Sequence, residues 1–243
     1  KDCDLIIITA GRNRKPGETR LDLIAGNSAI LKNVVDQMKP HYTKGVIMIV
    51  SNPVDVLVYQ CTKWMGLPNG MVFGTGCILD SSRFTRLIAD YTRLNTEVVK
   101  ATIVGEHGDA QIPIWSRVSI AGAPIQEYCE NVGLRWGENI RKDISDKVRE
   151  MGATIIKGKG RTHYGIATCV CYLAEAVLNQ RLTIAPVSTM FQGEYGIEDV
   201  CLSVPSIIGV NGVEKRLEER WAEEEFLAFR QAAEKMRNVL KTL

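Results

Sequence analysis

The chain has 243 residues, of which 45% are hydrophobic and 24% are charged, and its net charge is +2. This length is enough for one large or two small globular domains with a sizeable core. A charge so near balance argues against nucleic acid or an anionic membrane as a partner. No stretch has the pattern of a signal peptide or a membrane span.

Seven cysteines form no C-x-x-C pair, and the chain has three histidines. An odd number of cysteines without paired spacing is typical of reduced thiols, mostly in the core, in a cytoplasmic protein. The same spacing argues against a metal site. We therefore expect a cytoplasmic protein that holds no metal.

The first apolar run, residues 5–11, has the composition of a strand buried on both faces of a sheet. Because a sheet seldom starts with an interior strand, we expect the chain to begin inside a domain. A polar loop follows this run and contains a Pro-Gly turn. The loop carries four cations, which are Arg12, Arg14, Lys15 and Arg20.

Helical and strand patterns alternate through the first hundred residues. Apolar residues at helical spacing predict helices over 21–38, 54–64 and 79–91, and apolar runs predict strands over 46–50, 71–73 and 99–104. This alternation is typical of a parallel sheet with crossover helices. Polar residues lie at the strand ends or just beyond them, at Arg14, Asn52, Asp80 and His107. Because ligands bind beyond the carboxyl ends of such strands, we expect these residues to share one crevice.

The pattern changes beyond Pro113. Short strands are predicted over 117–121 and 123–125, followed by a long charged helix over 136–157 and a more apolar, more buried helix over 162–179. Strands over 182–190, 200–203 and 206–208 are separated by Gly193, Gly196 and Pro205, which predicts an antiparallel set. An amphipathic helix covers 221–243, with an apolar stripe that includes Phe226, Phe229, Ala233, Met236 and Leu240.

These elements predict an α/β fold with two parts. Residues 1–110 would form a partial Rossmann-type parallel sheet, the remainder of a dinucleotide-binding domain. Residues 111–243 would form a C-terminal α+β substrate domain with antiparallel strands and long helices.

The stretch 103–109 is the strongest candidate for chemistry. His107 follows an apolar strand and lies between Gly105 and Gly108, and such glycines indicate a tight backbone that approaches a ligand closely. A histidine titrates near neutral pH and therefore suits proton transfer. The motif alone is also compatible with an ordinary loop histidine.

Asp80 and Arg83 are three residues apart, nearly one turn along the same helix face. An arginine buried there can bind a carboxylate through two parallel hydrogen bonds, and Asp80 can accept a hydrogen bond from His107. Alternatively, Asp80 is a helix N-cap and Arg83 is an ordinary surface charge. Arg20 lies on a loop able to close over a crevice, or is a solvated residue of the first helical turn. Asn52 is either a turn residue or an amide that orients a carbonyl.

These residues belong to ordered blocks that resemble the L-lactate/malate dehydrogenase family over essentially the whole chain. The matching blocks are residues 8–11, 17–23, 51–55, 74–76, 79–81, 83–84, 105–109, 113–116, 162 with 165–167, 186–188 and 193–197.

The resemblance implies an NAD-linked, reversible oxidation of an L-2-hydroxy acid to a 2-oxo acid. His107 would exchange the proton with the C2 oxygen, and Asp80 would hold the imidazole and stabilise its charged form. Arg83 would bind the C1 carboxylate, and Arg20, on the closing loop, would polarise the carbonyl. The hydride chemistry belongs to the cofactor. The family is typically dimeric or tetrameric, which implies a homo-oligomer.

The same resemblance assigns the remaining binding residues. The substrate-binding set would be Arg14, Arg20, Asn52, Arg83 and Thr162. The cofactor-binding set would be Thr9, Ala10, Gly11, Asn13, Ser51 and Asn52.

Substrate choice in this family depends on the position six residues before Arg20, which faces the substrate's side chain. Lactate-type members usually carry Gln there and malate-type members Arg, and this chain has Arg14. A second carboxylate, as in oxaloacetate, would pair with Arg14, whereas pyruvate would leave it unpaired. This favours malate slightly. Lactate is the alternative, because the blocks around His107, Thr162 and residues 193–197 look more lactate-like.

No G-x-G-x-x-G turn followed by a ribose-binding acid occurs in the chain, and the spacing around Gly74 and Gly76 does not match one. We therefore expect the first strand–helix unit to precede Lys1. Two alternatives from other classes stay open: a truncated, non-catalytic interaction subunit, and a carboxylate-binding module that uses Arg83 without a redox step.

Overall fold

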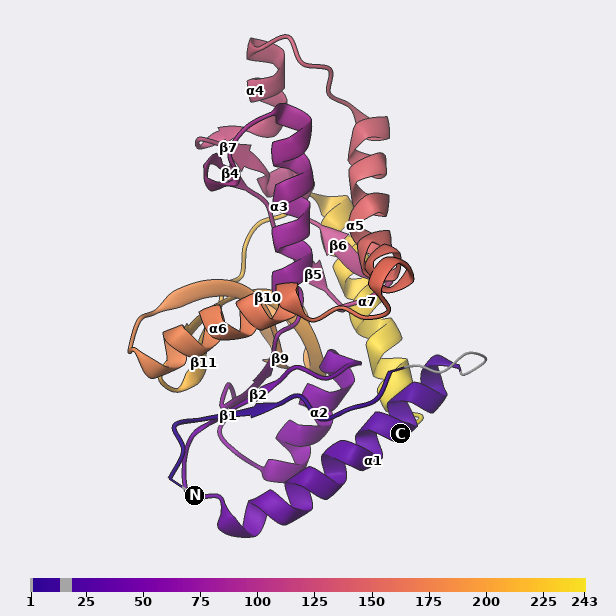
Figure 1. Cartoon of the computed structure of the whole chain (residues 1–243). Coiled ribbons are helices and arrows are strands. Elements are labelled where there is room, and N and C mark those ends of the chain that lie inside the picture. Colours follow the sequence, from indigo (N-terminus) through magenta and orange to yellow (C-terminus); the bar gives the residue numbers. More distant parts are fainter. Residues whose placement is uncertain (1, 14–18) are drawn as a thin grey trace.

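The computed structural model describes residues 2–13 and 19–243, except for the side chain of Arg20. An eight-stranded sheet lies at its centre (Figure 1). Along the sheet the order is β1 (Leu5–Ile8), β2 (Val46–Ile49), β3 (Val72–Gly74), β9 (Thr183–Gln192), β10 (Glu198–Gly209), β5 (Ile103–Gly105) and β6 (Gln111–Pro113), and β11 (Gly212–Arg216) pairs with β10. The strands β1, β2 and β3 are parallel, and the other pairs are antiparallel.

The predicted helices form with small shifts at their ends. They are α1 (Arg20–Met38), α2 (Val54–Met65), α3 (Ile78–Thr92), α5 (Glu138–Lys159), α6 (Tyr164–Leu178) and α7 (Glu223–Leu240). The α/β fold, with parallel strands followed by a C-terminal part rich in antiparallel strands and long helices, is therefore confirmed.

Some elements were not predicted. They are the helix α4 (Ile125–Asn131), the strands β6 and β11, and four short 3-10 helices, η1 (Lys39–His41), η2 (Thr96–Val98), η3 (Trp115–Arg117) and η4 (Glu194–Gly196). The predicted strand over 117–121 is shorter, because η3 occupies its start.

The prediction of one strand over 99–104 was wrong, because the chain changes sheets within it. β4 (Val99–Lys100) joins β7 (Ser119–Ile120) and β8 (Ala123–Pro124) in a separate three-stranded sheet. Between the two strands, the Ala101 carbonyl accepts a hydrogen bond from the hydroxyl of Thr85, and the Thr102 carbonyl accepts from the N–H of Ile114. β5 then enters the large sheet antiparallel to its neighbours, so the parallel part has three strands instead of four.

The predicted break at Pro205 was also wrong, because β10 runs through it. Pro205 lies opposite Pro186 of β9. Ser203, two residues earlier, pairs with β5, and the next residue, Ser206, pairs with β11. Because neither proline of this pair has a backbone N–H, the pair needs no hydrogen bond between the two residues, and β10 continues through it.

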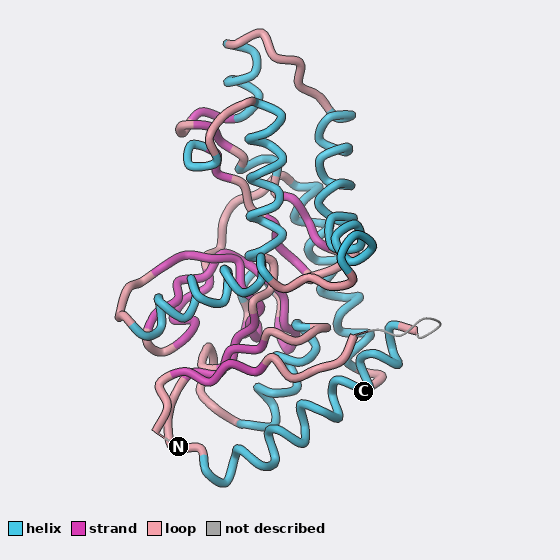
Figure 2. The backbone as a smooth tube through the Cα atoms, viewed as in Figure 1, coloured by secondary structure: helices cyan, strands magenta, loops and turns pink. Residues whose placement is uncertain are grey.

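Helices cover both faces of the parallel strands (Figure 2). The strand β2 is buried at all four positions. Ile47 and Ile49 pack in one core with α1 and α2, while Val46 and Met48 pack in another with α6. Side chains alternate across a strand, so a strand covered on both faces is apolar throughout.

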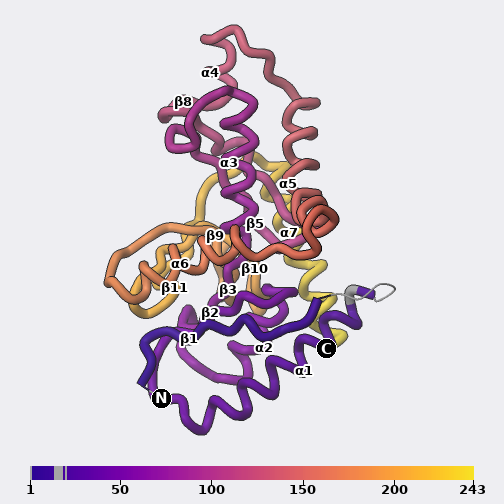
Figure 3. The backbone as a smooth tube through the Cα atoms, viewed as in Figure 1, coloured from indigo at the N-terminus to yellow at the C-terminus, as the bar shows by residue number. Residues whose placement is uncertain are grey.

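The start of α1 and the last helix, α7, meet in a third core. Ile24 of α1 packs with Phe229, Ala233 and Met236 of α7, and Figure 3 shows the end of α7 lying close to the start of α1. This confirms the apolar stripe predicted for the last helix. Within residues 2–13 and 19–243, no helix has the length and apolar character needed to cross a membrane.

Candidate active site

His107 lies in the turn that connects β5 to β6. Gly105 has a φ of 89° and Gly108 a φ of 152°, a region that side chains other than glycine seldom adopt. A Cβ at Gly105 would also lie 3.1 Å from the Ala110 carbonyl oxygen. The glycines therefore allow the chain to reverse tightly, and the imidazole between them stays 25% exposed.

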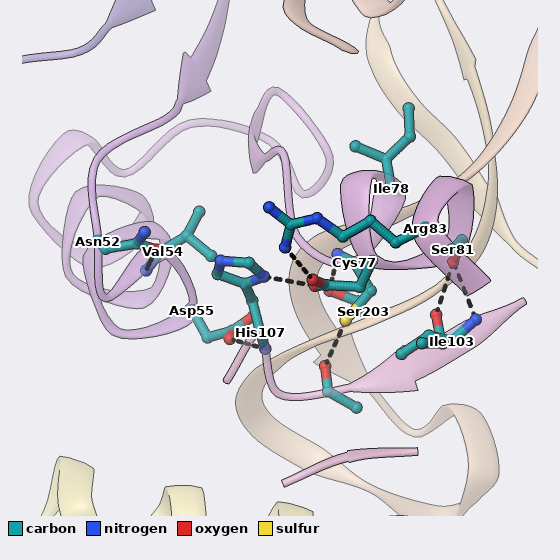
Figure 4. A network of polar contacts seen from close by, with 12 residues as sticks. Asn52, Val54, Asp55, Cys77, Ile78, Ser81, Arg83, Ile103, His107 and Ser203 are labelled. Atoms are coloured by element: carbon teal, nitrogen blue, oxygen red, sulfur yellow. Dashed lines mark hydrogen bonds and ion pairs between the residues drawn. The ribbon is translucent and has the colours of Figure 1, made fainter. Parts of the chain in front are cut away.

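The structure brings His107 together with Asp80 and Arg83 of α3. The imidazole Nδ1 lies 2.6 Å from Asp80 Oδ2, and Arg83 Nη1 lies 3.3 Å from Asp80 Oδ1. The Asp80 side chain is 4% exposed and the Arg83 side chain 13%. Figure 4 shows the side chains of Arg83 and His107 pointing toward each other. The alternative of a capping Asp80 and a surface Arg83 does not hold for this geometry.

The environment of His107 favours its charged form. Burial lowers the pKa of His107, but the hydrogen bond and the negative charge of Asp80, together with the charge of Asp55, outweigh burial and raise it overall. Arg83 opposes this effect weakly. An imidazole held in this way can carry a proton near neutral pH and release it.

A cavity of about 840 Å³ opens in front of these three residues. It lies at the ends of β1 and β2, between α3 and the helices α5 and α6. The predicted site residues that line it are Thr9, Gly11, Asn13, Ser51, Asn52, Asp80, Arg83, His107 and Thr162. The predicted crevice at the strand ends is therefore present as a cavity.

Three predicted residues lie elsewhere or outside the described part. The Ala10 carbonyl accepts a hydrogen bond of 2.6 Å from Ser51 Oγ, which ties the ends of β1 and β2 together. Arg14 lies outside the described residues. Arg20 begins α1, after a capping box between Thr19 and Asp22, and its side chain is not described.

The sequence reasoning missed Asn27, which holds the cavity floor. Asn27 is 1% exposed. Its amide oxygen accepts from the N–H of Arg12 at 2.8 Å, and its amide nitrogen donates to the carbonyls of Arg12 and Asn52. The position of Asn27 within an apolar helical pattern could have indicated this role, because a buried amide needs hydrogen-bond partners.

The sequence reasoning also missed the far wall of the cavity. Arg149 and Gly152 of α5 and His163 and Ile166 near the start of α6 line this wall. Burial and the charges of nearby cations lower the pKa of His163. No motif marked these positions, and only their spacing along two helices could have indicated a shared face.

The part of the cavity next to β1 and β2 suits the nicotinamide end of a dinucleotide. Thr9, Ser51 and Asn52 offer hydroxyl and amide groups, while Val50 and Ile166 add apolar surface. The backbone of Gly11 lies close to Ser51, since a Cβ at Gly11 would lie 3.2 Å from the Cβ of Ser51. Neutral donors and acceptors beside apolar side chains are compatible with a carboxamide on an aromatic ring.

Parallel strands whose ends form a cavity with a histidine–aspartate pair and an arginine are typical of the active site of an α/β enzyme. Comparison with family models is consistent with this class. Residues 1–74 match the NAD binding domain of lactate/malate dehydrogenases, and residues 77–243 match their alpha/beta C-terminal domain. The chain belongs to the lactate/malate dehydrogenase family, and it is an NAD-dependent oxidoreductase of that family.

Individual relatives are similar along the whole chain. An L-lactate dehydrogenase of Acetivibrio thermocellus is 38% identical over 246 residues, which cover 100% of this chain and 78% of the relative. One of Thermoanaerobacterium saccharolyticum is 41% identical over 243 residues, with the same two coverages. The crystal structure of a minor L-lactate dehydrogenase from Enterococcus mundtii in its ligands-bound form aligns with a TM-score of 0.94 at 38% identity, covering 100% of this chain and 77% of that one.

Proposed function

We propose that this chain catalyses the reversible, NAD-linked oxidation of L-lactate to pyruvate. The contact between His107 Nδ1 and Asp80 Oδ2, with Arg83 beside it, is the observation that carries the proposal. The similar proteins named above are L-lactate dehydrogenases, and they favour lactate over the slight preference for malate that Arg14 suggested.

His107 acts as the acid and the base. Because Asp80 accepts the hydrogen bond from Nδ1, the other ring nitrogen, Nε2, is free to exchange a proton with the C2 oxygen of the substrate. In pyruvate reduction the charged imidazole gives its proton to the forming hydroxyl. In lactate oxidation the neutral imidazole takes the proton, and Asp80 stabilises the resulting positive charge.

Arg83 binds the substrate's carboxylate. One of its terminal nitrogens contacts Asp80, and the guanidinium has further donors for two parallel hydrogen bonds to a carboxylate. Arg20 polarises the carbonyl when its loop closes, and Asn52 and Thr162 complete the substrate contacts. Closure excludes water and strengthens each of these interactions.

NAD, when bound, supplies the hydride chemistry at the substrate's C2 carbon. Its nicotinamide end would be held by Thr9, Ala10, Gly11, Asn13, Ser51 and Asn52.

We propose a domain boundary near residue 110. We also propose a homo-oligomeric assembly, either a dimer or a tetramer, whose mass can be measured by light scattering on the protein as it elutes from a size-exclusion column.

The substitution His107→Asn tests the proposal. Turnover of pyruvate with NADH should fall by about a thousandfold, since proton transfer by a placed side chain contributes on the order of 10²–10⁴. His41→Asn is the matched control, because His41 is exposed and does not line the cavity. Equal, measurable rates in His107→Asn and the unaltered protein would refute the proposed role of His107, whereas an unaltered protein without turnover would favour the non-catalytic subunit.

Malate is the second candidate substrate, and the identity of Arg14 favours it. The ratio of kcat/KM for pyruvate to that for oxaloacetate separates the two candidates. If oxaloacetate is preferred, Arg14→Gln should shift the preference toward pyruvate, because the second carboxylate of oxaloacetate would lose its cationic partner. A preference for pyruvate in the unaltered protein supports lactate.

A further inference from the structure

Asp55 is a buried carboxylate in the first turn of α2, and the reaction proposed above gives it no role. It is 1% exposed and follows Ser51 and Asn52, which line the cavity. A buried charge is costly unless it is hydrogen-bonded. The positive end of the α2 dipole lowers this cost, since a carboxylate is favoured at a helix N-terminus.

Asp55 is hydrogen-bonded to the backbone of the catalytic turn. Its Oδ2 accepts from the N–H of His107 at 2.8 Å, and Figure 4 shows this contact on the side of the imidazole away from Arg83. The two residues are 52 positions apart in sequence. The contact therefore fastens the β5–β6 turn to a helix of the NAD-binding half.

The turn around His107 is paired at its base, where Gly105 of β5 lies opposite Gln111 of β6. Gly105 and Gly108 give it conformational freedom. Within the turn, the N–H of Gln111 donates to the carbonyl of Gly108 at a long distance of 3.3 Å. A catalytic group on such a turn needs an external anchor, because a displacement of about 1 Å can reduce the rate by about 100-fold.

We propose that Asp55 is a positioning residue of this enzyme, which fixes the backbone of His107 while Asp80 fixes its ring. This inference rests on the proposed role of His107. Two carboxylates from two helices, α2 and α3, then determine where the imidazole lies and which charge it prefers.

The charges around the pair are consistent with this role. Asp80 and Arg83 face His107 from α3, and the thiols of Cys77 and Cys201 lie near Asp55. Burial, the largest cause, raises the pKa of both thiols well above its usual value, so they stay neutral. The negative charge of Asp55 therefore adds to that of Asp80 in favouring the imidazolium, and loss of the Asp55 charge should lower the pKa of His107.

Two substitutions separate the charge of Asp55 from its hydrogen bond. Asp55→Asn keeps an acceptor oxygen for the N–H of His107 and removes the charge, whereas Asp55→Ala removes both. We expect kcat for pyruvate to fall about tenfold in Asp55→Asn and about 100-fold in Asp55→Ala. Asp36→Asn is the control, because Asp36 is an exposed carboxylate of α1 paired with Lys32.

NMR titration of the imidazoles supplies a readout that a purely structural role would not change. The chain has three histidines, so the signal of His107 can be assigned by its loss in His107→Asn. In Asp55→Asn the His107 titration should move to lower pH, and the alkaline limb of the kcat/KM profile for pyruvate should move with it. An unmoved titration, or kcat unchanged in Asp55→Ala, would overturn the proposal.

One measurement needs no variant at Asp55. In the unaltered protein the amide proton of His107 should exchange slowly with solvent, because it is bonded to a buried carboxylate. Exchange at the rate of an exposed amide overturns the proposal even if both variants fail to fold. Full activity of His107→Asn would refute the proposed function instead. The two failures can be told apart, because neither the titration of His107 nor its amide exchange depends on turnover.

Discussion

Replacement of Asp80 by Asn tests the centre of the proposed mechanism most directly. The variant keeps the shape of the side chain but removes the charge that lies 2.6 Å from His107 Nδ1. The Asp80 side chain is 4% exposed, so solvent screens this charge poorly. A hydrogen bond to a charged group contributes about 1.5–3 kcal/mol. If that stabilisation supports the transition state, kcat should fall by roughly 10- to 150-fold.

The pH profile supplies a second, signed readout for the same variant. Without Asp80, burial is the dominant influence left on His107, and burial lowers its pKa. Pyruvate reduction needs the charged imidazole, so its rate in Asp80→Asn should decline at a lower pH than in the unaltered protein. NADH absorbance would follow both reactions.

Asp90→Asn is the matched control for Asp80→Asn. Asp90 lies on the same helix and forms an exposed pair with Arg86, so its loss should change kcat and the pH profile little. A folded Asp80→Asn variant with unchanged kcat and an unmoved pH limb would refute the assignment of His107 as the proton carrier.

Three further predictions follow from the same geometry. Arg83→Lys should raise KM for pyruvate by about 100-fold at nearly unchanged NADH affinity, because a lysine offers no planar pair of donors; equal KM values would contradict this. Phe229→Ala should lower the free energy of unfolding in urea by about 3–5 kcal/mol, since Phe229 is fully buried; a loss under about 1 kcal/mol would contradict this. The pKa of His107 is raised in the folded protein. The contact with Asp80 therefore stabilises the folded state fully below the ordinary histidine pKa, and this stability is lost as the pH rises through the raised pKa. The urea midpoints of the unaltered protein and Asp80→Asn should therefore differ more at about pH 5 than at about pH 9.

The sequence was informative wherever neighbouring residues alone decide the structure. The helical period from Leu21 onward predicted α1, and the apolar run 46–50 predicted β2, because periodicity reports which faces are buried. The glycines around His107 predicted a tight turn, which positive φ angles at Gly105 and Gly108 confirm. The spacing of Asp80 and Arg83 predicted a shared helix face, because a helix fixes the geometry of residues three apart.

The sequence was less informative wherever strand partners decide. The run 99–104 has the composition of one strand, but the two halves pair in different sheets. Pro205 looked like a strand break, but β10 runs through it opposite Pro186 of β9. Composition reports that a residue is buried, but it does not report which strand lies beside it.

The amino-acid sequence by itself determined the local elements, the turn that carries His107 and the family to which the chain belongs. Tertiary structure alone decided that Asp80 contacts the imidazole, that Asp55 holds the His107 backbone from 52 residues away, and that α5 and α6 form the far wall of the cavity. The physical reason is that periodicity and turn preferences act over a few residues. Contacts between distant residues depend on how whole helices and strands pack, and that packing is set by the complete set of buried faces together.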